Sequence, residues 1–382
     1  MAALGGGATG FLSSLKLECP DLSARCIDLP NGCADDDALG ILRQELALDQ
    51  GRVEVGYPGQ VRHVFDSAPL DMPKAPSGPA DPQGPILATG GVRGITAAFL
   101  HALARPGTPL IVVGRSPAPD DEPEHLAACP DLPALRKALA EAALASGSGQ
   151  RPAEIEAAAR RILRDRAARA ALAALRDAGF MVDCRACDLR DPQAVAALID
   201  AVTDRHGPIR TLVHGAGVIE DQLIADKTAA SFDRVVDTKI AALPVLLDNP
   251  KLAGLARVVF FSSVAGRFGN RGQGDYAAAN EVLNRAALWL KGARPNLDVL
   301  SFNWGPWAGG GMASDAVNAL FRARDIIPID PRSGIALGRA ALAAGGPVEL
   351  IAGAGDWNRD LVQEAWPATG ARPKARTEEI KS

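Results

Sequence analysis

Short apolar segments alternate with longer helix-like stretches over most of the 382-residue chain. A short, uninterrupted apolar run is typical of a strand buried on both faces of a parallel sheet, and helices between such strands supply right-handed crossovers. The pattern therefore predicts an α/β fold, a doubly wound parallel sheet with helices on both faces. The expected strands are Ile86–Thr89, Leu110–Gly114, Phe180–Asp188, Thr211–His214, Val258–Ser262, Val299–Asn303 and Val348–Ala352.

The first 66 residues weakly repeat the end of this series. A helix-like stretch from Leu15 and a strand-like one at Ala24–Leu29 correspond to the helix and strand expected within Leu288–Trp304. Residues Arg52–Phe65 have the pattern of two strands joined by a short turn, a β-hairpin. We expect residues 1–66 to be the end of a second, truncated Rossmann-like half, and the chain to be a piece of a larger protein.

A proline-rich segment separates these residues from the sheet. Prolines recur every three or four residues between Pro69 and Pro85. Because proline fixes φ and lacks an amide donor, residues 67–85 are expected to form an extended linker. The domain that holds the sheet is then expected over residues 86–355, and a C-terminal tail over 356–382.

A long stretch also separates the second expected strand from the third. Residues 116–179 are rich in alanine and in charge, and a simple crossover requires far fewer residues. Helices are expected at Pro133–Ala145 and from Pro152 to about Ala178, because proline suits the first turn of a helix and Gly179 suits its end. We interpret this stretch as a helical insertion on the surface.

Composition excludes several classes of protein. Lys and Arg total 41 against 45 Asp and Glu, a net charge of −4, which argues against a nucleic-acid partner. No apolar run approaches the roughly 18 residues of a membrane span, and no basic residue precedes Lys16 as in a signal peptide. Cys184 and Cys187 lack the second pair of a zinc site, so no metal is expected. These features predict a cytoplasmic protein without a membrane segment.

A glycine-rich turn follows the first expected strand. The sequence Thr-Gly-Gly-Val-Arg-Gly-Ile-Thr at 89–96 precedes a helix expected over Ala97–Arg105, the arrangement in which a Rossmann-type sheet binds a pyrophosphate. Arg115 ends the next strand 21 residues after Gly94, where a guanidinium suits a 2′-phosphate, so NADPH is favoured over NADH. A solvated arginine at a strand end is the alternative.

Two further strand ends fit a dinucleotide. Asp188 could hold an adenine amino group, and the small residues after His214 would let the cofactor lie against the sheet, with His214 itself structural. The expected cofactor contacts are Thr89, Gly90, Gly91, Arg93, Gly94, Ile95, Arg115, Ser116, Asp188, Leu189, Gly215, Ala216 and Gly217, together with Lys239 and Tyr276.

Candidate chemistry gathers after the fifth expected strand. Ser263 ends that strand, Tyr276 follows 13 residues later at the start of a helix, and Asn280 lies one turn further on its inward face. Lys239 falls on the apolar stripe of the preceding helix, and a buried lysine usually has a partner. A lysine that extends out of the stripe to water is the alternative.

These motifs together resemble the short-chain dehydrogenase/reductase superfamily. Most of its members have lysine four residues after the tyrosine and asparagine on the preceding helix, whereas here Asn280 and Lys239 are exchanged. The exchange, with the sequence F-S-S-V-A-G-R-F-G-N-R-G-Q-G-D-Y-A-A-A-N at 261–280 and N-W-G-P-W at 303–307, resembles the β-ketoacyl reductase (ketoreductase) domains of type I polyketide synthases and polyunsaturated fatty acid synthases. The long insertion is most similar to the second group.

The resemblance implies a reaction and a role for each residue. It implies NADPH-dependent reduction of a 3-oxoacyl thioester on an acyl carrier protein, and it implies that residues 1–66 belong to a non-catalytic structural subdomain. Tyr276 would donate the proton, and Ser263 would hold the ketone oxygen. Lys239 as an ammonium would lower the pKa of Tyr276, and Asn280 would orient Lys239 or a water.

The substrate side of the site follows from the same resemblance. Asp221 matches the acid of B-type domains and Phe268 replaces the tryptophan of A-type domains, which implies a (3R)-hydroxyacyl product. Residues 305–329 would form a lid over the acyl-pantetheine arm, with Pro306, Trp307 and Met312 as substrate contacts. Other synthase domains are expected partners. The alternatives are a non-catalytic NADPH-binding structural or sensor module, and a free-standing reductase of small ketones.

Overall fold

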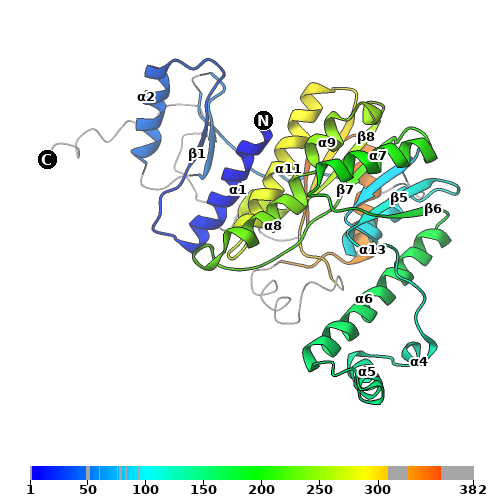
Figure 1. Ribbon diagram of the computed structural model, residues 1–382. Helices are drawn as coiled ribbons and strands as arrows, with labels where there is room; N and C mark the ends of the chain where they lie inside the picture. The colour runs from blue at the N-terminus through cyan, green and yellow to red at the C-terminus, as the bar shows by residue number, and fades with distance from the viewer. Residues whose placement is uncertain are drawn as a thin grey trace.

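Seven parallel strands form the main sheet of the computed structural model, in the order β10-β9-β8-β7-β4-β5-β6 (Figure 1). The structure describes residues 2–48, 52–59, 61–74, 76, 80–81, 84–92, 94–308 and 326–353. The sheet confirms the predicted fold class, and all seven expected strands are present within about two residues of their predicted bounds. They are β4 (Ile86–Thr89), β5 (Pro109–Gly114), β6 (Met181–Ala186), β7 (Thr211–His214), β8 (Arg257–Ser263), β9 (Asp298–Trp304) and β10 (Glu349–Ala352).

Alternate residues of each strand enter two cores, one on each face of the sheet. In β8, Val258 and Phe260 pack with α7 (Pro192–His206), α9 (Leu243–Asp248) and α11 (Gly274–Ala293). Val259 and Phe261 pack on the other face with α3 (Gly94–Leu100) and α13 (Pro331–Ala344). Each such side chain contributes about 1.5–3 kcal/mol when fully buried, which explains why the centre of β8 is apolar without interruption.

The strand order creates the crevice in which a parallel sheet binds ligands. β4 lies between β5 and β7, and the connection from β4 to β5 runs in the opposite direction to the connection from β7 to β8. At such a point the loops after the carboxyl ends of neighbouring strands diverge and leave a crevice. The expected helix after β4 is shorter than predicted, because the chain tightens into a 3-10 turn at His101–Leu103 before Pro106 ends it.

The insertion after β5 forms a small helical unit. It consists of α4 (Glu124–Ala127), α5 (Leu132–Ser146) and α6 (Pro152–Asp177), so both expected helices are confirmed. In Figure 1 the start of α6 extends away from the sheet and carries α4 and α5 with it. A separate cluster of buried apolar side chains and the ion pair between Arg166 and Glu122 (2.7 Å) hold the three helices together.

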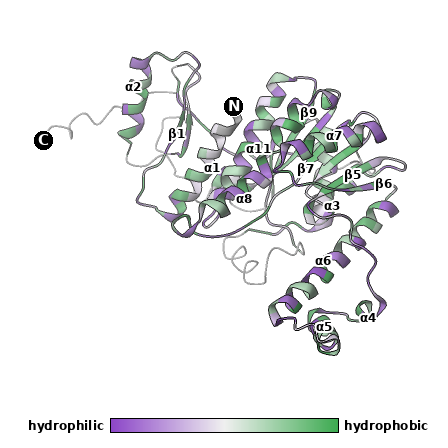
Figure 2. Ribbon diagram, in the orientation of Figure 1, coloured by the Kyte–Doolittle hydropathy of each residue, from purple (hydrophilic) through white to green (hydrophobic). Residues whose placement is uncertain are grey.

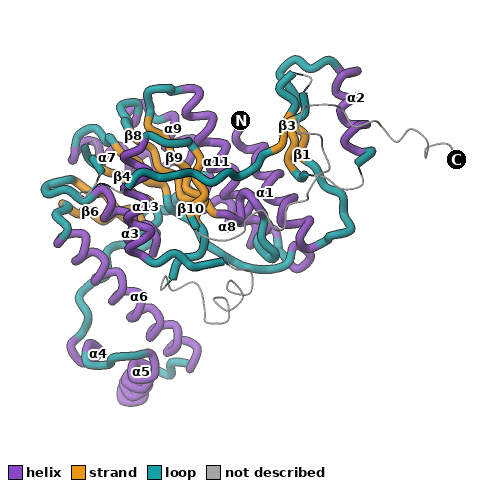
Figure 3. The backbone as a smooth tube through the Cα atoms, turned by 180° about the vertical axis from the view of Figure 1, so that it is seen from behind, coloured by secondary structure: helices purple, strands orange, loops and turns teal. Residues whose placement is uncertain are grey.

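The N-terminal residues form a second, smaller sheet. Its order is β1-β2-β3, from Cys26–Asp28, Glu54–Gly56 and His63–Val64, and α2 (Asp35–Leu46) lies beside it (Figure 3). The antiparallel pairing of β2 with β3 confirms the expected hairpin. The first helix, α1 (Ala2–Glu18), lies against α11 in both views, and a Cβ at Gly10 would come within 2.3 Å of the Ala277 carbonyl oxygen.

The proline-rich linker runs along the main domain (Figure 3). Its described residues have no helix or strand, as expected. The Ala80 amide donates to the Ala102 carbonyl (2.7 Å), and the Asp81 carbonyl accepts from Arg257 (2.6 Å). These contacts fix the extended linker to the surface of the main domain.

Hydropathy distinguishes the central strands from the helices around them. Figure 2 shows green along the central strands, whereas α2 and α6 carry purple segments. Of the helices in the described ranges, none combines the length and the apolar character that crossing a membrane requires.

Candidate active site

The glycine turn after β4 packs against the backbone of the turn after β7 and is hydrogen-bonded to β5. Gly90 has a φ of +105°, and a Cβ there would lie 2.6 Å from the carbonyl of Gly215 in the turn after β7. The amides of Gly90 and Gly91 donate to the Val113 carbonyl at 3.1 and 2.9 Å. Only glycine allows this positive φ together with so close an approach. Of the expected contacts in this turn, Arg93 lies outside the described residues, and Gly94 begins α3 next to Ile95.

The structure brings Arg115 and Asp188 together at the ends of β5 and β6. Hydrogen bonds from Arg190 (2.6 Å from Nη2) lower the pKa of Asp188 to about 2, and the charge of Arg115 adds to this effect. Arg115 and Ser116 are exposed, while Leu189 is buried. Arg190 was not predicted as a partner of Asp188, although an arginine two residues after the carboxylate is close enough in sequence to indicate such a pair.

His214 connects the end of β4 with the helix that carries Lys239. Its Nδ1 lies 2.8 Å from Thr89 Oγ1, and its Nε2 lies 2.7 Å from the Lys239 carbonyl. Burial lowers the pKa of His214 to about 4, so the ring is neutral at pH 7. Because a carbonyl only accepts, Nε2 donates to it and Nδ1 accepts from the threonine. His214 is therefore structural, as predicted, and it anchors α8 (Ala229–Ile240) at Lys239.

Lys239 is buried, which excludes the alternative that its amine extends to water. Its residue is 4% exposed, and Nζ donates to the Phe261 carbonyl at 2.8 Å and lies 5.8 Å from the centre of the Tyr276 ring. A Cβ at Gly217 would be 3.2 Å from Lys239 Cε, so this glycine leaves room beside the amine. No carboxylate in the described ranges pairs with it, and burial lowers the pKa of Lys239 to about 7.

Tyr276 and Asn280 lie in the first turns of α11, close to Ser263 at the end of β8. Burial raises the pKa of Tyr276, and hydrogen bonds with Asn280 and Ser263 oppose that shift. Asn280 is fully buried, and its Nδ2 donates to the Tyr276 carbonyl at 2.7 Å. The net direction is the reverse of the predicted lowering by Lys239, because desolvation disfavours the phenolate and Nζ is bonded to Phe261.

The predicted substrate residues are only partly brought to this site. Asp221 accepts a hydrogen bond from Gln273 Nε2 at 3.0 Å, and burial raises the pKa of Asp221. The negative charge of Asp221 in turn contributes to the raised pKa of Tyr276. Trp307, in contrast, is buried in the core, 5.1 Å between ring centres from Trp304 and directly against Gly334. Phe268 and Pro306 are half-buried, whereas Met312 and most of the expected lid lie outside the described residues.

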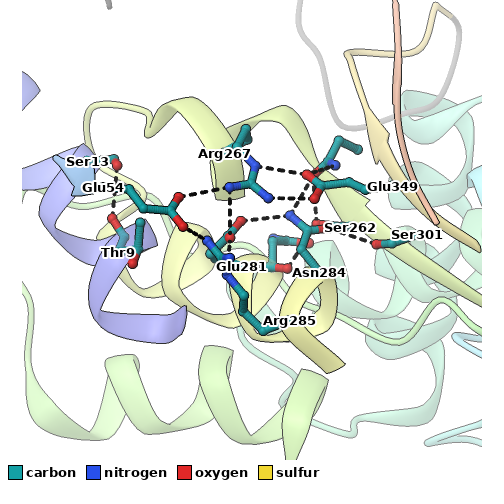
Figure 4. Close-up of polar contacts among 12 residues, drawn as sticks. Thr9, Ser13, Glu54, Ser262, Arg267, Glu281, Asn284, Arg285, Ser301 and Glu349 are labelled. Carbon is teal, nitrogen blue, oxygen red and sulfur yellow. Dashed lines mark hydrogen bonds and ion pairs between the residues drawn. The ribbon is translucent and has the colours of Figure 1, made fainter. Parts of the chain in front are cut away.

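A buried polar cluster behind the site was not predicted from the sequence (Figure 4). The Ser262 hydroxyl bonds the carbonyl of Asn280 (3.0 Å) and the side chain of Asn303 (3.1 Å), which ties α11 to β8 and β9. Next to it, Arg267 lies between three carboxylates, those of Glu54, Glu281 and Glu349. Burial raises the pKa of Glu281 to about 8, against the effect of Arg267.

Comparison with known proteins identifies what this arrangement is similar to. The family model of the KR domain matches residues 84–309. The chain is 33% identical over 360 residues to a polyunsaturated fatty acid synthase protein of Thraustochytrium sp., and the match covers 91% of this chain and 13% of that protein. It is 39% identical over 186 residues to the polyketide synthase GfsA of Streptomyces halstedii, covering 47% of this chain and 2% of that protein.

A solved structure gives the same answer for the fold. The first ketoreductase of the tylosin PKS aligns with a TM-score of 0.66 at 27% identity, over 93% of this chain and 66% of that one. The chain spans a small fraction of the length of the two synthases, so their activities and partners belong to much longer proteins.

Proposed function

The chain belongs to the KR domain family, and on this premise we propose that it reduces a 3-oxoacyl thioester to a 3-hydroxyacyl thioester with NADPH. The predicted resemblance to ketoreductase domains is confirmed. One observation carries the proposal: a buried amine, Lys239 Nζ, lies 5.8 Å from the ring centre of Tyr276, beside Ser263. The substrate is proposed to arrive on the pantetheine arm of an acyl carrier protein, and other synthase domains are the proposed neighbours.

The proton for the ketone oxygen comes from Tyr276 in this proposal. Ser263 donates a hydrogen bond to the same oxygen and fixes its position. Because burial raises the pKa of Tyr276, a positive charge nearby favours release of the proton. In this proposal Lys239 supplies that charge in its protonated form, which its pKa of about 7 leaves partly populated at neutral pH. Asn280 Oδ1 is buried and accepts no hydrogen bond within the described ranges, so it can accept one from Lys239 or from a water.

The residues present suit a dinucleotide phosphate. NADPH, when bound, supplies the hydride. The turn at Gly90 and the space at Gly217 leave backbone free of side chains beside the sheet and the lysine, and the exposed guanidinium of Arg115 suits a 2′-phosphate. We propose these three as cofactor contacts, with Asp188 toward the adenine.

The product is proposed to have the (3R) configuration. Support comes from Asp221, which Gln273 holds close enough to Tyr276 to influence its titration. Phe268 and Met312 are proposed on the substrate side, whereas the core position of Trp307 does not favour a contact with the acyl chain.

Turnover of a minimal substrate tests the proposal. Purified protein is mixed with NADPH and β-ketoacyl N-acetylcysteamine thioesters of several chain lengths, and absorbance of the reduced nicotinamide is followed. We expect consumption of NADPH and a (3R) product on a chiral column. Absence of turnover at every chain length, with NADPH bound and the fold intact, would support the non-catalytic module instead. Small ketones reduced as well as the thioesters would support a free-standing reductase.

A further inference from the structure

The last residue of α1 holds two loops that flank Tyr276. Glu18 Oε2 accepts the backbone N–H of Ile224 at 2.7 Å, and Oε1 accepts that of Gly272 at 2.9 Å. Ile224 lies in the loop between β7 and α8, whereas Gly272 lies in the loop between α10 (Val264–Phe268) and α11. A carboxylate from the N-terminal segment therefore joins two loops of the main domain that are far apart in sequence.

These two loops carry Asp221 and Gln273, and the charge of Asp221 acts on the proposed proton donor, Tyr276. The first contains Asp221, and the second contains Gln273, three residues before Tyr276. Gln273 Nε2 donates to Asp221 Oδ1 at 3.0 Å, and the Gln222 amide donates to the Gly272 carbonyl at 2.9 Å. Because the loops are bonded to each other as well as to Glu18, a shift of one displaces Asp221 relative to the tyrosine.

The helix that ends in Glu18 packs closely on the second loop. Gly269 has a φ of +73°, and a Cβ there would lie 2.5 Å from the backbone of Ser13. The Asn270 amide donates to the hydroxyl of Ser14 at 3.1 Å, and Ser14 is fully buried. The backbone of α1 thus lies directly on the second loop, and these contacts hold the helix there in addition to the hydrogen bonds of Glu18.

A carboxylate suits this position better than an amide. Its two oxygens accept two backbone N–H groups at once, and such charge-assisted bonds are about twice as strong as neutral ones. Glutamine has one acceptor oxygen, and its NH2 group would face the second N–H donor. Replacement of Glu18 by Gln therefore breaks one of the two bonds with little change in volume.

We propose that Glu18 is a positioning residue for the substrate: it sets the loop of Asp221 against the loop of Gln273, and so determines how the 3-oxoacyl group is presented to Tyr276. This role rests on the proposed function. It assigns to the N-terminal segment a part in substrate selection in addition to its packing on α11.

Kinetics of Glu18→Gln test the proposal, with Glu141→Gln on the exposed face of α5 as the matched control. We expect the KM for the β-ketoacyl thioester to rise about tenfold and the (3R):(3S) product ratio to fall, while the dissociation constant of NADPH stays unchanged. The control should match the wild type in all three. Lower thermal stability with an unchanged KM and product ratio would show a merely structural role and overturn the proposal.

Hydrogen–deuterium exchange provides a readout that does not require turnover. In Glu18→Gln, the amides of Ile224 and Gly272 should exchange faster than in the wild type, and those of β8 should not. Unchanged exchange at both amides overturns the proposal whatever the kinetics. A wild type that reduces no thioester refutes the proposed function instead, and the two failures are thereby distinguished. Ser14→Ala, which loosens the same loop through Asn270, is the second variant should Glu18→Gln not fold.

Discussion

Two buried polar regions meet at α11, one around Lys239, Tyr276 and Asn280 and the other around Arg267 and Glu281. In the first, Lys239 has no carboxylate partner within the described chain, and Asn280 Oδ1 accepts no hydrogen bond there. In the second, Arg267 lies 2.9, 3.3 and 2.5 Å from the carboxylates of Glu54, Glu281 and Glu349.

The two regions differ in whether the buried cation has an opposite charge beside it. A buried amine without an opposite charge costs free energy, which supports the proposal that Lys239 meets its partners when a ligand binds. The guanidinium of Arg267 is satisfied already by the opposite charges around it, although burial raises the pKa of one partner, Glu281, to about 8. Arg267 joins β2 of the small sheet to α10, α11 and β10 of the main domain, because Glu54 and Glu349 come from those two sheets (Figure 4).

The largest expected effect is the loss of the phenol from the unsatisfied region. Tyr276→Phe should lower kcat/KM for the thioester by about 10²–10⁴-fold, because general acid catalysis contributes that much. The free energy of unfolding and the affinity for NADPH should stay close to the wild type, and both are measured on the same preparation. Equal rates for the two proteins would remove Tyr276 from the reaction.

The next effect belongs to the satisfied region. Arg267→Met removes the shared partner of one buried and two half-buried carboxylates, and the free energy of unfolding in urea should fall by about 3–5 kcal/mol. Lys239→Met is the matched comparison, since it also replaces a buried cation by methionine, and it should leave stability unchanged or raise it. Similar losses for both variants would contradict the distinction between the regions.

The proximity of Lys239, Tyr276, Ser263 and Asn280 could be predicted because its signals in the sequence are local. Strands buried on both faces are apolar throughout, as in Val258–Phe261, and the expected sheet followed from them. Lys239 was recognisable because a charge interrupts an apolar stripe of one helix. Ser263, Tyr276 and Asn280 lie at fixed spacings along one segment, so their proximity required only the fold.

The satisfied region could not be predicted in this way. The partners of Arg267 come from β2, α11 and β10, and nothing in their spacing reveals which carboxylate meets which guanidinium. Glu18 was missed for a different reason, because it bonds backbone N–H groups, which have no sequence signature. The direction of the Tyr276 pKa also required the structure, since burial raises it against the hydrogen bonds with Asn280 and Ser263.

Titration of Lys239 should make the free energy of unfolding depend on pH. Its pKa is about 7 in the folded chain, against about 10.4 for an unfolded lysine, so the unfolded chain binds more protons between these values. Stability therefore rises with pH in this window, by at most about 1.4 kcal/mol per pH unit. The difference in unfolding free energy between the wild type and Lys239→Met, measured from pH 6 to 10, should show this slope. A difference independent of pH would mean that the amine keeps its ordinary pKa.

The smallest effect extends the same contrast to the cofactor edge of the sheet. Arg190 is bonded to Asp188, whereas Arg115 is exposed and acts on Asp188 only through its charge. Since Arg115 keeps its donors available, Arg115→Ala should raise the KM for NADPH about tenfold, the loss of one charge-assisted contact, and leave the KM for NADH unchanged. Arg190→Ala is the matched variant, and it should change the two constants equally. If only Arg190→Ala changes the KM for NADPH relative to that for NADH, the 2′-phosphate binds Arg190, the guanidinium that is paired with Asp188. A guanidinium with free donors would then not be the phosphate contact.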